Sequence, residues 1–251
     1  MKISVSDRKR YLPLYLLFLC AFALAMILLS SLGFFLSQKA QLTEMIVPEC
    51  SSPTVSLPTV ILDAGHGGED GGTVGLNGIY EKDLNLEIAA LLDQMLQVSG
   101  FPTVMTRTED ILLYDKNSDY HGQKKVQDLA TRRKIAEQYD NAIFISIHMN
   151  AFPQSQYSGL QVYYSLNDTR SFSLAQSIQQ TTKETLLPNN QRKIKPTNGN
   201  LYLLDHLQCP AVLIECGFLS NPDECQRLST EEYRQQLAIA IALSIFRYCE
   251  E

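Results

Sequence analysis

The pattern of apolar and polar positions predicts a domain in which short strands alternate with helices. Runs rich in Val, Ile, Phe and Tyr have the length of buried strands; they are residues 59–63, 103–107, 142–148, 160–165 and 211–216. Helical segments separate most of these runs. Such an order favours a three-layer α/β fold, with a mostly parallel, mixed central sheet and helices on both faces.

The helix expected after the first strand has the clearest pattern. Its apolar residues recur on one stripe at helical spacing; they are Leu84, Ile88, Leu91, Leu92 and Met95. Asp83 is predicted to cap its N-terminus, and Gly100 is predicted to end it. Three further helices are predicted at about residues 125–139, 170–187 and 230–248, and a capping-box sequence precedes the last of them.

The N-terminal part of the chain contains an uncharged apolar run over residues 11–36. A helix of this length, at ~1.5 Å per residue, exceeds the ~30 Å thickness of a bilayer core. The basic residues Arg8, Lys9 and Arg10 precede the run, which predicts that residues 1–10 stay in the cytoplasm while the rest of the chain crosses the membrane. We therefore expect an uncleaved transmembrane anchor, with a cleaved signal peptide and secretion as the alternative.

Charge and composition separate this anchor from the rest of the chain. The first 36 residues carry a net charge of +3, whereas residues 37–251 carry −9. Residues 37–58 are predicted to be a linker because they combine Pro, Ser and Thr with no periodicity, which leaves a single domain over residues 59–251. With 19% charged residues, the chain is neither a disordered polyelectrolyte nor a basic nucleic-acid binder.

Several reactive residue types carry no functional signal of their own. The six cysteines form no CxxC pair, so buried free thiols are expected. His121 and His206 fall in polar loops and are expected at the surface. The glycine-rich segment after the first strand is not a dinucleotide motif, because Asp70 occupies the third glycine position of GxGxxG. Its glycines are expected to let the backbone approach a ligand closely.

Metal-binding and acid–base residues follow three of the predicted strands. The first strand runs into His66, the third into His148 and the fifth into Glu215, while Glu81 lies just before the first helix. Because the carboxyl ends of parallel strands share one edge of a sheet, we expect these side chains to converge. Two imidazoles, a carboxylate ligand and a second carboxylate as base are the set that a catalytic zinc site uses.

Each of these residues also has a simpler interpretation. A histidine at a strand end is, by itself, more often a hydrogen-bonded structural residue. A glutamate beside a run of Val, Leu and Ile is harder to explain in this way, because its burial is costly unless it is paired or bound to a cation. Asp63, three residues before His66, either orients a ligand imidazole or caps a turn.

Five successive motifs resemble those of the zinc-dependent N-acetylmuramoyl-L-alanine amidases of the amidase-3 type. They are VILDAGHGGEDGG from Val60, EKDLNL from Glu81, TRTED from Thr106, FISIHMNA from Phe144 and PAVLIECGFLSNP from Pro210. The resemblance extends from about residue 58 to the C-terminus. One departure is Glu137, where the family often has Asn after the alanine.

The resemblance implies the role of each site residue. It implies that His66, Glu81 and His148 bind one zinc ion and that Glu215 is the catalytic carboxylate. It also makes Arg132 a structural or substrate-orienting residue. Asn150, in the same motif as His148, is expected beside the ligands or the substrate.

The implied reaction is hydrolysis of the amide between the lactyl group of N-acetylmuramic acid and L-alanine of the peptidoglycan stem peptide. Zinc would activate water, and Glu215 would pass the proton of that water to the leaving amine. Arg192, Lys193 and Lys195 would contact stem-peptide carboxylates, or form only a solvated loop. A carboxypeptidase acting on stem peptides and a non-catalytic envelope-binding protein are the alternatives.

The single domain with an N-terminal anchor resembles the sporulation and germination amidases of endospore formers. This resemblance implies a part in spore-cortex maturation, where muramic-δ-lactam forms together with a separate deacetylase. It also implies an extracytoplasmic, membrane-anchored location, such as the space between the forespore and mother-cell membranes. An activating lipoprotein is a further expected partner.

Overall fold

A computed structural model describes residues 26, 30, 56–117 and 121–250 of the chain. The chain divides into two compact units, Met1–Val55 and Ser56–Glu251. In the first unit only Met26 and Ser30 are described, and both are helical. The expected anchor, apart from these two residues, and most of the expected linker lie outside the described residues. Within the described part of the chain, no helix has both the length and the apolar character that a membrane span requires.

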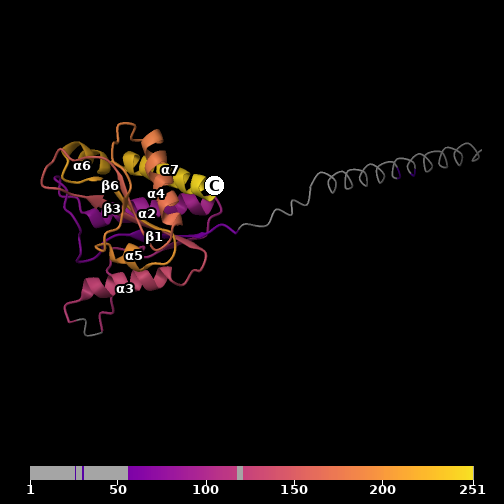
Figure 1. Ribbon diagram of the computed structural model, residues 1–251, viewed down its shortest axis with the longest axis horizontal. Coiled ribbons are helices and arrows are strands. Elements are labelled where there is room, and N and C mark those ends of the chain that lie inside the picture. The colour runs from indigo at the N-terminus through magenta and orange to yellow at the C-terminus, as the bar shows by residue number, and fades with distance from the viewer. Residues whose placement is uncertain (1–25, 27–29, 31–55, 118–120, 251) are drawn as a thin grey trace, which may run out of the picture. The chain divides into compact units, whose positions relative to one another are not determined.

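The second unit is built on a six-stranded sheet with the strand order β2-β1-β3-β6-β4-β5 (Figure 1). The strands are β1 (Thr59–Ala64), β2 (Thr103–Met105), β3 (Ala142–Asn150), β4 (Gln161–Tyr164), β5 (Lys195–Pro196) and β6 (Ala211–Phe218). The neighbours from β2 to β6 are parallel, β4 is antiparallel to β6, and β5 is parallel to β4. The predicted mostly parallel, mixed sheet is therefore confirmed.

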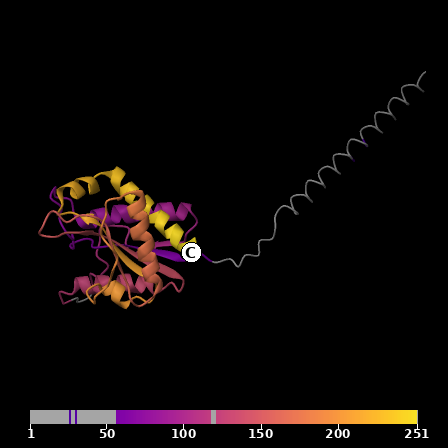
Figure 2. The same ribbon diagram turned by 45° about the horizontal axis from the view of Figure 1, so that its top comes forward.

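Helices cover both faces of the sheet, as predicted (Figures 1 and 2). They are α2 (Glu81–Val98), α3 (Lys124–Ala136), α4 (Arg170–Thr185), α5 (Tyr202–His206), α6 (Pro222–Leu228) and α7 (Glu231–Glu250). Alternate strand residues point to opposite faces. Val60 and Leu62 belong to a large apolar core shared with α2, α4 and α7, whereas Ile61 belongs to a smaller core shared with α3 and α5. Further along these strands, the side chains on the same face as the smaller core lie at the carboxyl edge of the sheet, on the face that α3 covers.

The start of α2 differs from the prediction. The helix begins at Glu81, with Tyr80 as its N-cap and no side-chain cap, so the prediction that Asp83 caps it is wrong. The N–H of Glu81 donates to Thr73 O at 2.8 Å, which ties the first turn to the glycine-rich segment. The first N–H groups of a helix have no partner within the helix and are often bonded by a capping side chain. Here the Thr73 carbonyl takes the place of such a side chain for one of them. Gly100, with φ of 86°, follows the end of the helix as expected.

Short elements were missed from the pattern. The helices α5 and α6 have only 5 and 7 residues, and β5 has 2, which is too short for apolar periodicity to show. A signal for α6 does exist in the sequence. The Asn221 side chain accepts the Glu224 N–H at 3.1 Å, and Pro222 occupies the first turn, which is a standard way to begin a helix.

Candidate metal centre

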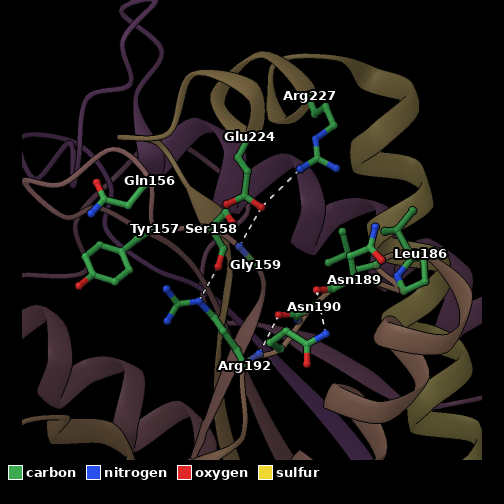
Figure 3. A pocket seen from close by; sticks show the side chains of 13 residues that line it. Gln156, Tyr157, Ser158, Gly159, Leu186, Asn189, Asn190, Arg192, Glu224 and Arg227 are labelled. Atoms are coloured by element: carbon green, nitrogen blue, oxygen red, sulfur yellow. Dashed lines mark hydrogen bonds and ion pairs between the residues drawn. The ribbon is translucent and has the colours of Figure 1, made fainter.

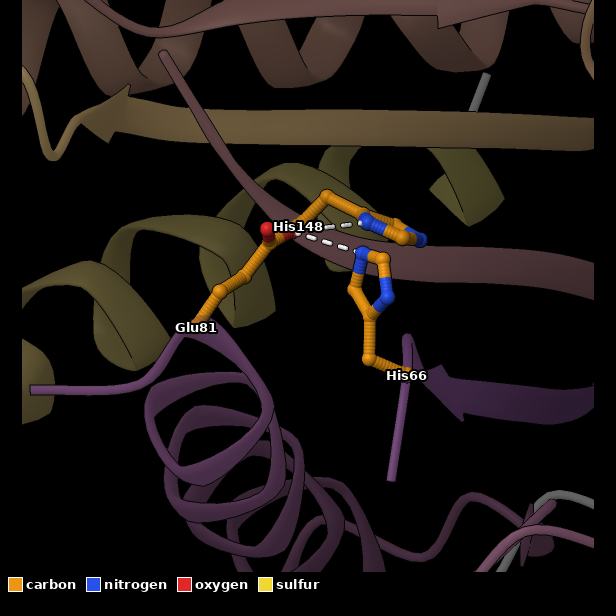
Figure 4. Close-up of side chains that lie close together, drawn as sticks. All are labelled: His66, Glu81 and His148. Carbon is orange, nitrogen blue, oxygen red and sulfur yellow. Dashed lines mark hydrogen bonds and ion pairs between the residues drawn. The ribbon is translucent and has the colours of Figure 1, made fainter. Parts of the chain in front are cut away.

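His66, Glu81 and His148 meet at the carboxyl edge of the sheet (Figure 4). His66 follows β1, Glu81 opens α2 and His148 lies on β3. Glu81 Oε1 lies 3.3 Å from His66 Nε2 and 3.0 Å from His148 Nδ1, and one donor atom from each residue lies within 4.8 Å of the others. Tetrahedral zinc ligands at ~2.0–2.1 Å from the ion are about 3.3 Å apart. The donor set and its spacing therefore fit one zinc ion and leave a fourth position open.

The carboxylate of Glu81 is 3% exposed and has a partner at each oxygen. Besides the two imidazoles, Oε1 accepts the N–H of Met149 at 3.0 Å, and Oε2 accepts the N–H of Thr73 at 2.8 Å. Burial alone would raise the pKa of Glu81, but hydrogen bonds from His148 and His66 outweigh burial and hold the pKa of this carboxyl well below its usual range. Glu81 is therefore a fixed negative charge between two imidazoles.

The backbone at His66 is held in an uncommon conformation. His66 has φ of 62°, in the left-handed region that non-glycine residues rarely adopt. Its Nδ1 lies 2.9 Å from Asp70 Oδ1, so the residue that interrupts the dinucleotide motif places a negative charge beside this imidazole. Burial lowers the pKa of His66, but Glu81 and Asp70 more than compensate and raise that pKa above its usual value. Glu81 and Asp70 therefore both favour a positive charge at the His66 imidazole.

Two glycines let the backbone approach the three side chains closely. A Cβ on Gly65 would lie 2.2 Å from the His148 ring, and a Cβ on Gly72 would lie 2.6 Å from Glu81 Oε2. Real Cβ atoms do not come this close, so side chains at these positions would displace the donors. The glycine-rich segment therefore packs around the candidate metal ligands, in line with the close approach that the sequence indicated.

A buried ion pair supports the segment that carries His66. Arg132 and Asp63 are each 1% exposed, and Arg132 Nη1 lies 2.8 Å from Asp63 Oδ1. Arg132 also donates to the carbonyls of Ala64 and His66, both at 2.7 Å, and pairs with Asp128 at 2.8 Å. The hydrogen bonds of Asp63 go to Arg132 and to neighbouring hydroxyls, so it acts on His66 through Arg132. Burial raises the pKa of Asp63, but the Arg132 charge and these bonds outweigh it and hold the pKa below its usual value.

Arg107 is a supporting residue that sequence reasoning missed. Its guanidinium is buried and donates to the carbonyls of Ala64 at 2.8 Å, Gly65 at 3.1 Å and Lys82 at 2.8 Å. The Gly65 carbonyl also accepts from Asn85 Nδ2 at 3.0 Å. The sequence signal for this residue was its place in the TRTED motif. The motif alone does not predict which carbonyls the arginine contacts.

Glu215 lies on β6 as the register partner of His148 on β3. In parallel strands such partners point to the same face, so its carboxylate faces the same side as the His148 ring. Glu215 Oε2 is buried and accepts no hydrogen bond. Burial raises the pKa of Glu215 from its usual 4.5 to about 7, although His148 acts in the opposite direction. A buried carboxylate with a free oxygen is suited to exchanging protons near neutral pH.

The remaining predicted residues are distributed around this edge. Asn150, Arg192 and Lys195 line a cavity of about 310 Å³, whereas Lys193 lines a separate cavity against α4. A larger cavity of about 530 Å³ lies between Arg192 and Arg227 (Figure 3). His121 and His206 are exposed, as predicted, but His206 ends the short helix α5, so the prediction that it lies in a loop is wrong. Four of the described cysteines are free, as predicted, but only Cys216 and Cys225 are buried, whereas Cys209 and Cys249 are half-buried.

The chain is similar to known proteins over most of its length. A family described as N-acetylmuramoyl-L-alanine amidase matches residues 60–247. The germination-specific N-acetylmuramoyl-L-alanine amidase of Bacillus subtilis is 37% identical over 192 residues, which are 76% of this chain and 80% of that protein.

Solved structures give the same result. The CwlD amidase from Clostridioides difficile, solved in complex with the GerS lipoprotein, has a TM-score of 0.73 and 39% identity, and the match covers 77% of this chain and 98% of that one. The amidase AmiC2 of Nostoc punctiforme has a TM-score of 0.66 and 29% identity over 77% of this chain and 98% of that one.

The Asp63–Arg132 pair generates a stability prediction. Replacing Arg132 by Met leaves the Asp63 carboxylate buried and unpaired, and we expect the free energy of unfolding to fall by about 3–5 kcal/mol, measured by urea denaturation. Arg133→Met is the matched control, because Arg133 pairs with Glu137 at the surface, and it should leave the urea midpoint unchanged. Equal midpoints for the two variants would contradict the structural role of Arg132.

Proposed function

The chain belongs to the amidase-3 family of N-acetylmuramoyl-L-alanine amidases, and from this premise we propose that it is a zinc enzyme whose ion is held by His66, Glu81 and His148. As a peptidoglycan amidase it cleaves the amide between the lactyl group of N-acetylmuramic acid and L-alanine of the stem peptide. The observation that carries the zinc assignment is the convergence of two imidazoles and a buried carboxylate on one point beside Glu215.

Each side chain of the site has a distinct part in this reaction. A bound zinc ion supplies Lewis acidity that polarises the amide carbonyl and lowers the pKa of water. Glu215 takes the proton of the attacking water on its unpartnered oxygen and delivers it to the leaving amine. Glu81 stays ionised because two backbone N–H groups and two imidazoles contact it. Arg107 and Arg132 hold the carbonyls of the segment that positions His66.

We also propose a role in spore-cortex maturation. Support comes from the B. subtilis relative, whose name is germination-specific, and from the C. difficile neighbour, which was solved with a lipoprotein. In this role the amidase acts before a separate deacetylase in forming muramic-δ-lactam, and a lipoprotein is its partner. The apolar run over residues 11–36 would anchor it outside the cytoplasm, in the space between the forespore and mother-cell membranes.

Product analysis tests the amidase activity and the metal together. Zinc-loaded full-length chain should release stem peptides with a free L-alanine amino terminus from purified peptidoglycan, as detected by mass spectrometry, and chelation should abolish the release. A carboxypeptidase would release free D-alanine instead, and a non-catalytic binding protein would release nothing. Either of these results, or release that survives chelation, would contradict the proposal.

Glu215→Gln tests the proton carrier. The variant keeps the side-chain volume but cannot accept a proton, so turnover should fall by at least about 100-fold while one zinc per chain is still bound. Because Glu215 must be ionised to act, wild-type activity should fall as the pH drops through its pKa. Burial raises the pKa of Glu215 to about 7 and a bound cation lowers it, so this fall should lie below about pH 7. Retained turnover in the zinc-bound variant would remove Glu215 from this role.

The cortex role has its own test. A strain lacking this protein should make spores whose cortex contains little muramic-δ-lactam, because the lactam requires a muramic acid freed of its stem peptide. Muropeptide analysis of the cortex measures this directly. Normal lactam content would contradict the sporulation role and would leave the amidase activity standing.

A further inference from the structure

The sheet edge carries the metal ligands, Glu215 and a cationic cavity in that order. The two candidate histidine ligands lie at β1 and β3, Glu215 lies on β6, and β4 and β5 follow. Glu215 is the register partner of His148 on one side and of Gln161 on the other. Gln161 lines the cavity of about 310 Å³ together with Asn150, Tyr163, Arg192, Lys195 and Phe218. The cavity therefore lies beside Glu215 and extends from β4 and β5 to Asn150 at the end of β3.

Arg192 is held rigidly at this cavity by neutral groups. Its Nε donates to Ser158 O at 2.7 Å, its Nη1 donates to Gln161 Oε1 at 3.0 Å, and its guanidinium carbon lies 4.3 Å from the centre of the Phe218 ring. Among the described residues, Arg192 forms no ion pair, although its charge acts on Glu215 at longer range. An arginine that is ordered without a carboxylate partner is available to an anionic ligand.

The charged residues that line the cavity are all cationic. Lys195 stands on its exposed rim beside Tyr163, its register partner in β4, and none of the residues that line the cavity is acidic. This is a local excess of cations in a part of the chain, residues 37–251, whose net charge is −9. Arg192 is half-buried, which reduces the screening of its charge, so a carboxylate here gains a charge-assisted hydrogen bond.

The direction of the reaction identifies which part of the substrate enters. Glu215 must lie beside the leaving amine in order to protonate it, and the chain that continues from this amine is the stem peptide. The glycan side offers no free carboxylate, because the lactyl carboxyl group is itself part of the scissile amide. A carboxylate next to Glu215 therefore belongs to the peptide.

We propose that the cavity between Gln161 and Lys195 is the stem-peptide subsite, where Arg192 and Lys195 bind the first free carboxylate after the scissile bond. This inference rests on the amidase function proposed above. In a stem whose second residue is a γ-linked glutamate, that carboxylate is the glutamate α-carboxylate. The glycan strand then lies on the opposite side of the candidate metal ligands, towards the glycine-rich segment.

The peptide has space to continue beyond this carboxylate. Arg192 and Tyr157 line both this cavity and the larger one of about 530 Å³, so they form a shared wall (Figure 3). Arg227 and Glu224 also line the larger cavity and pair with each other at 3.4 Å. A stem of several residues can therefore extend past Arg192 towards Gly159, which precedes β4.

The side chains of Lys195 and Lys193 line different cavities. The backbone carbonyl of Lys193 accepts a hydrogen bond from Gln161 Nε2 at 2.7 Å, but its side chain lines the cavity against α4. Of the three cations that the sequence grouped together, the subsite uses Arg192 and Lys195 only. Lys193 provides a matched control two positions from Lys195 in the same segment.

The test uses two substrates that differ at one group. Zinc-loaded full-length chain is given a disaccharide pentapeptide whose glutamate α-carboxyl is either free or amidated, and kcat and KM are measured. The free carboxylate should be preferred by about 10-fold or more in kcat/KM. Lys195→Ala and Arg192→Gln should lose this preference through a raised KM for the free-carboxylate substrate, with little change for the amide. Lys193→Ala should behave as the wild type.

Each other outcome is decisive. Equal kcat/KM for the two substrates in the wild type, or the same loss in Lys193→Ala as in Lys195→Ala, would overturn the subsite and leave the amidase activity intact. Failure of the wild type to cleave either substrate would overturn the proposed function and the subsite with it. Because Lys195 is exposed in a two-residue strand, its replacement tests the charge without disturbing the core.

Discussion

The buried carboxylate of Glu81 is the interaction on which the rest of this structure depends. An ionised carboxylate at 3% exposure is costly unless its oxygens are satisfied, and here each oxygen accepts a backbone N–H. The donors come from Thr73 and Met149, so one side chain joins the glycine-rich segment, α2 and β3. The two imidazoles that share Oε1 complete a negative site with an open side, which is the electrostatic setting that a divalent cation requires.

The segment after β1 meets a second requirement, because its carbonyls leave the strand ladder and still need donors. Two buried arginines supply them. Arg107 reaches the carbonyls of Ala64 and Gly65, and Arg132 reaches those of Ala64 and His66. Asp63 and Asp128 balance the charge of Arg132, so the uncommon backbone conformation of His66 is fixed by an ionic network that runs from α3 to β1.

The sequence pattern predicted the strands and the converging side chains well, because apolar runs that end in His or Glu place those residues at one edge of a parallel sheet. It failed for features that depend on contacts between residues far apart in the sequence. The start of α2 depends on Thr73, the roles of Arg107 and Asp70 depend on which groups they reach, and the two-residue strand β5 is too short to show which way Lys193 and Lys195 point. The anchor over residues 11–36 stays a prediction.

X-ray absorption at the zinc edge of the loaded full-length chain tests whether His66, Glu81 and His148 hold one zinc ion. We expect one zinc per chain with nitrogen and oxygen ligands at about 2.0–2.2 Å, and we expect this zinc to be lost in Glu81→Gln. Sulfur ligands at about 2.3 Å, which would point to the free cysteines, or undiminished zinc in Glu81→Gln, would contradict this assignment.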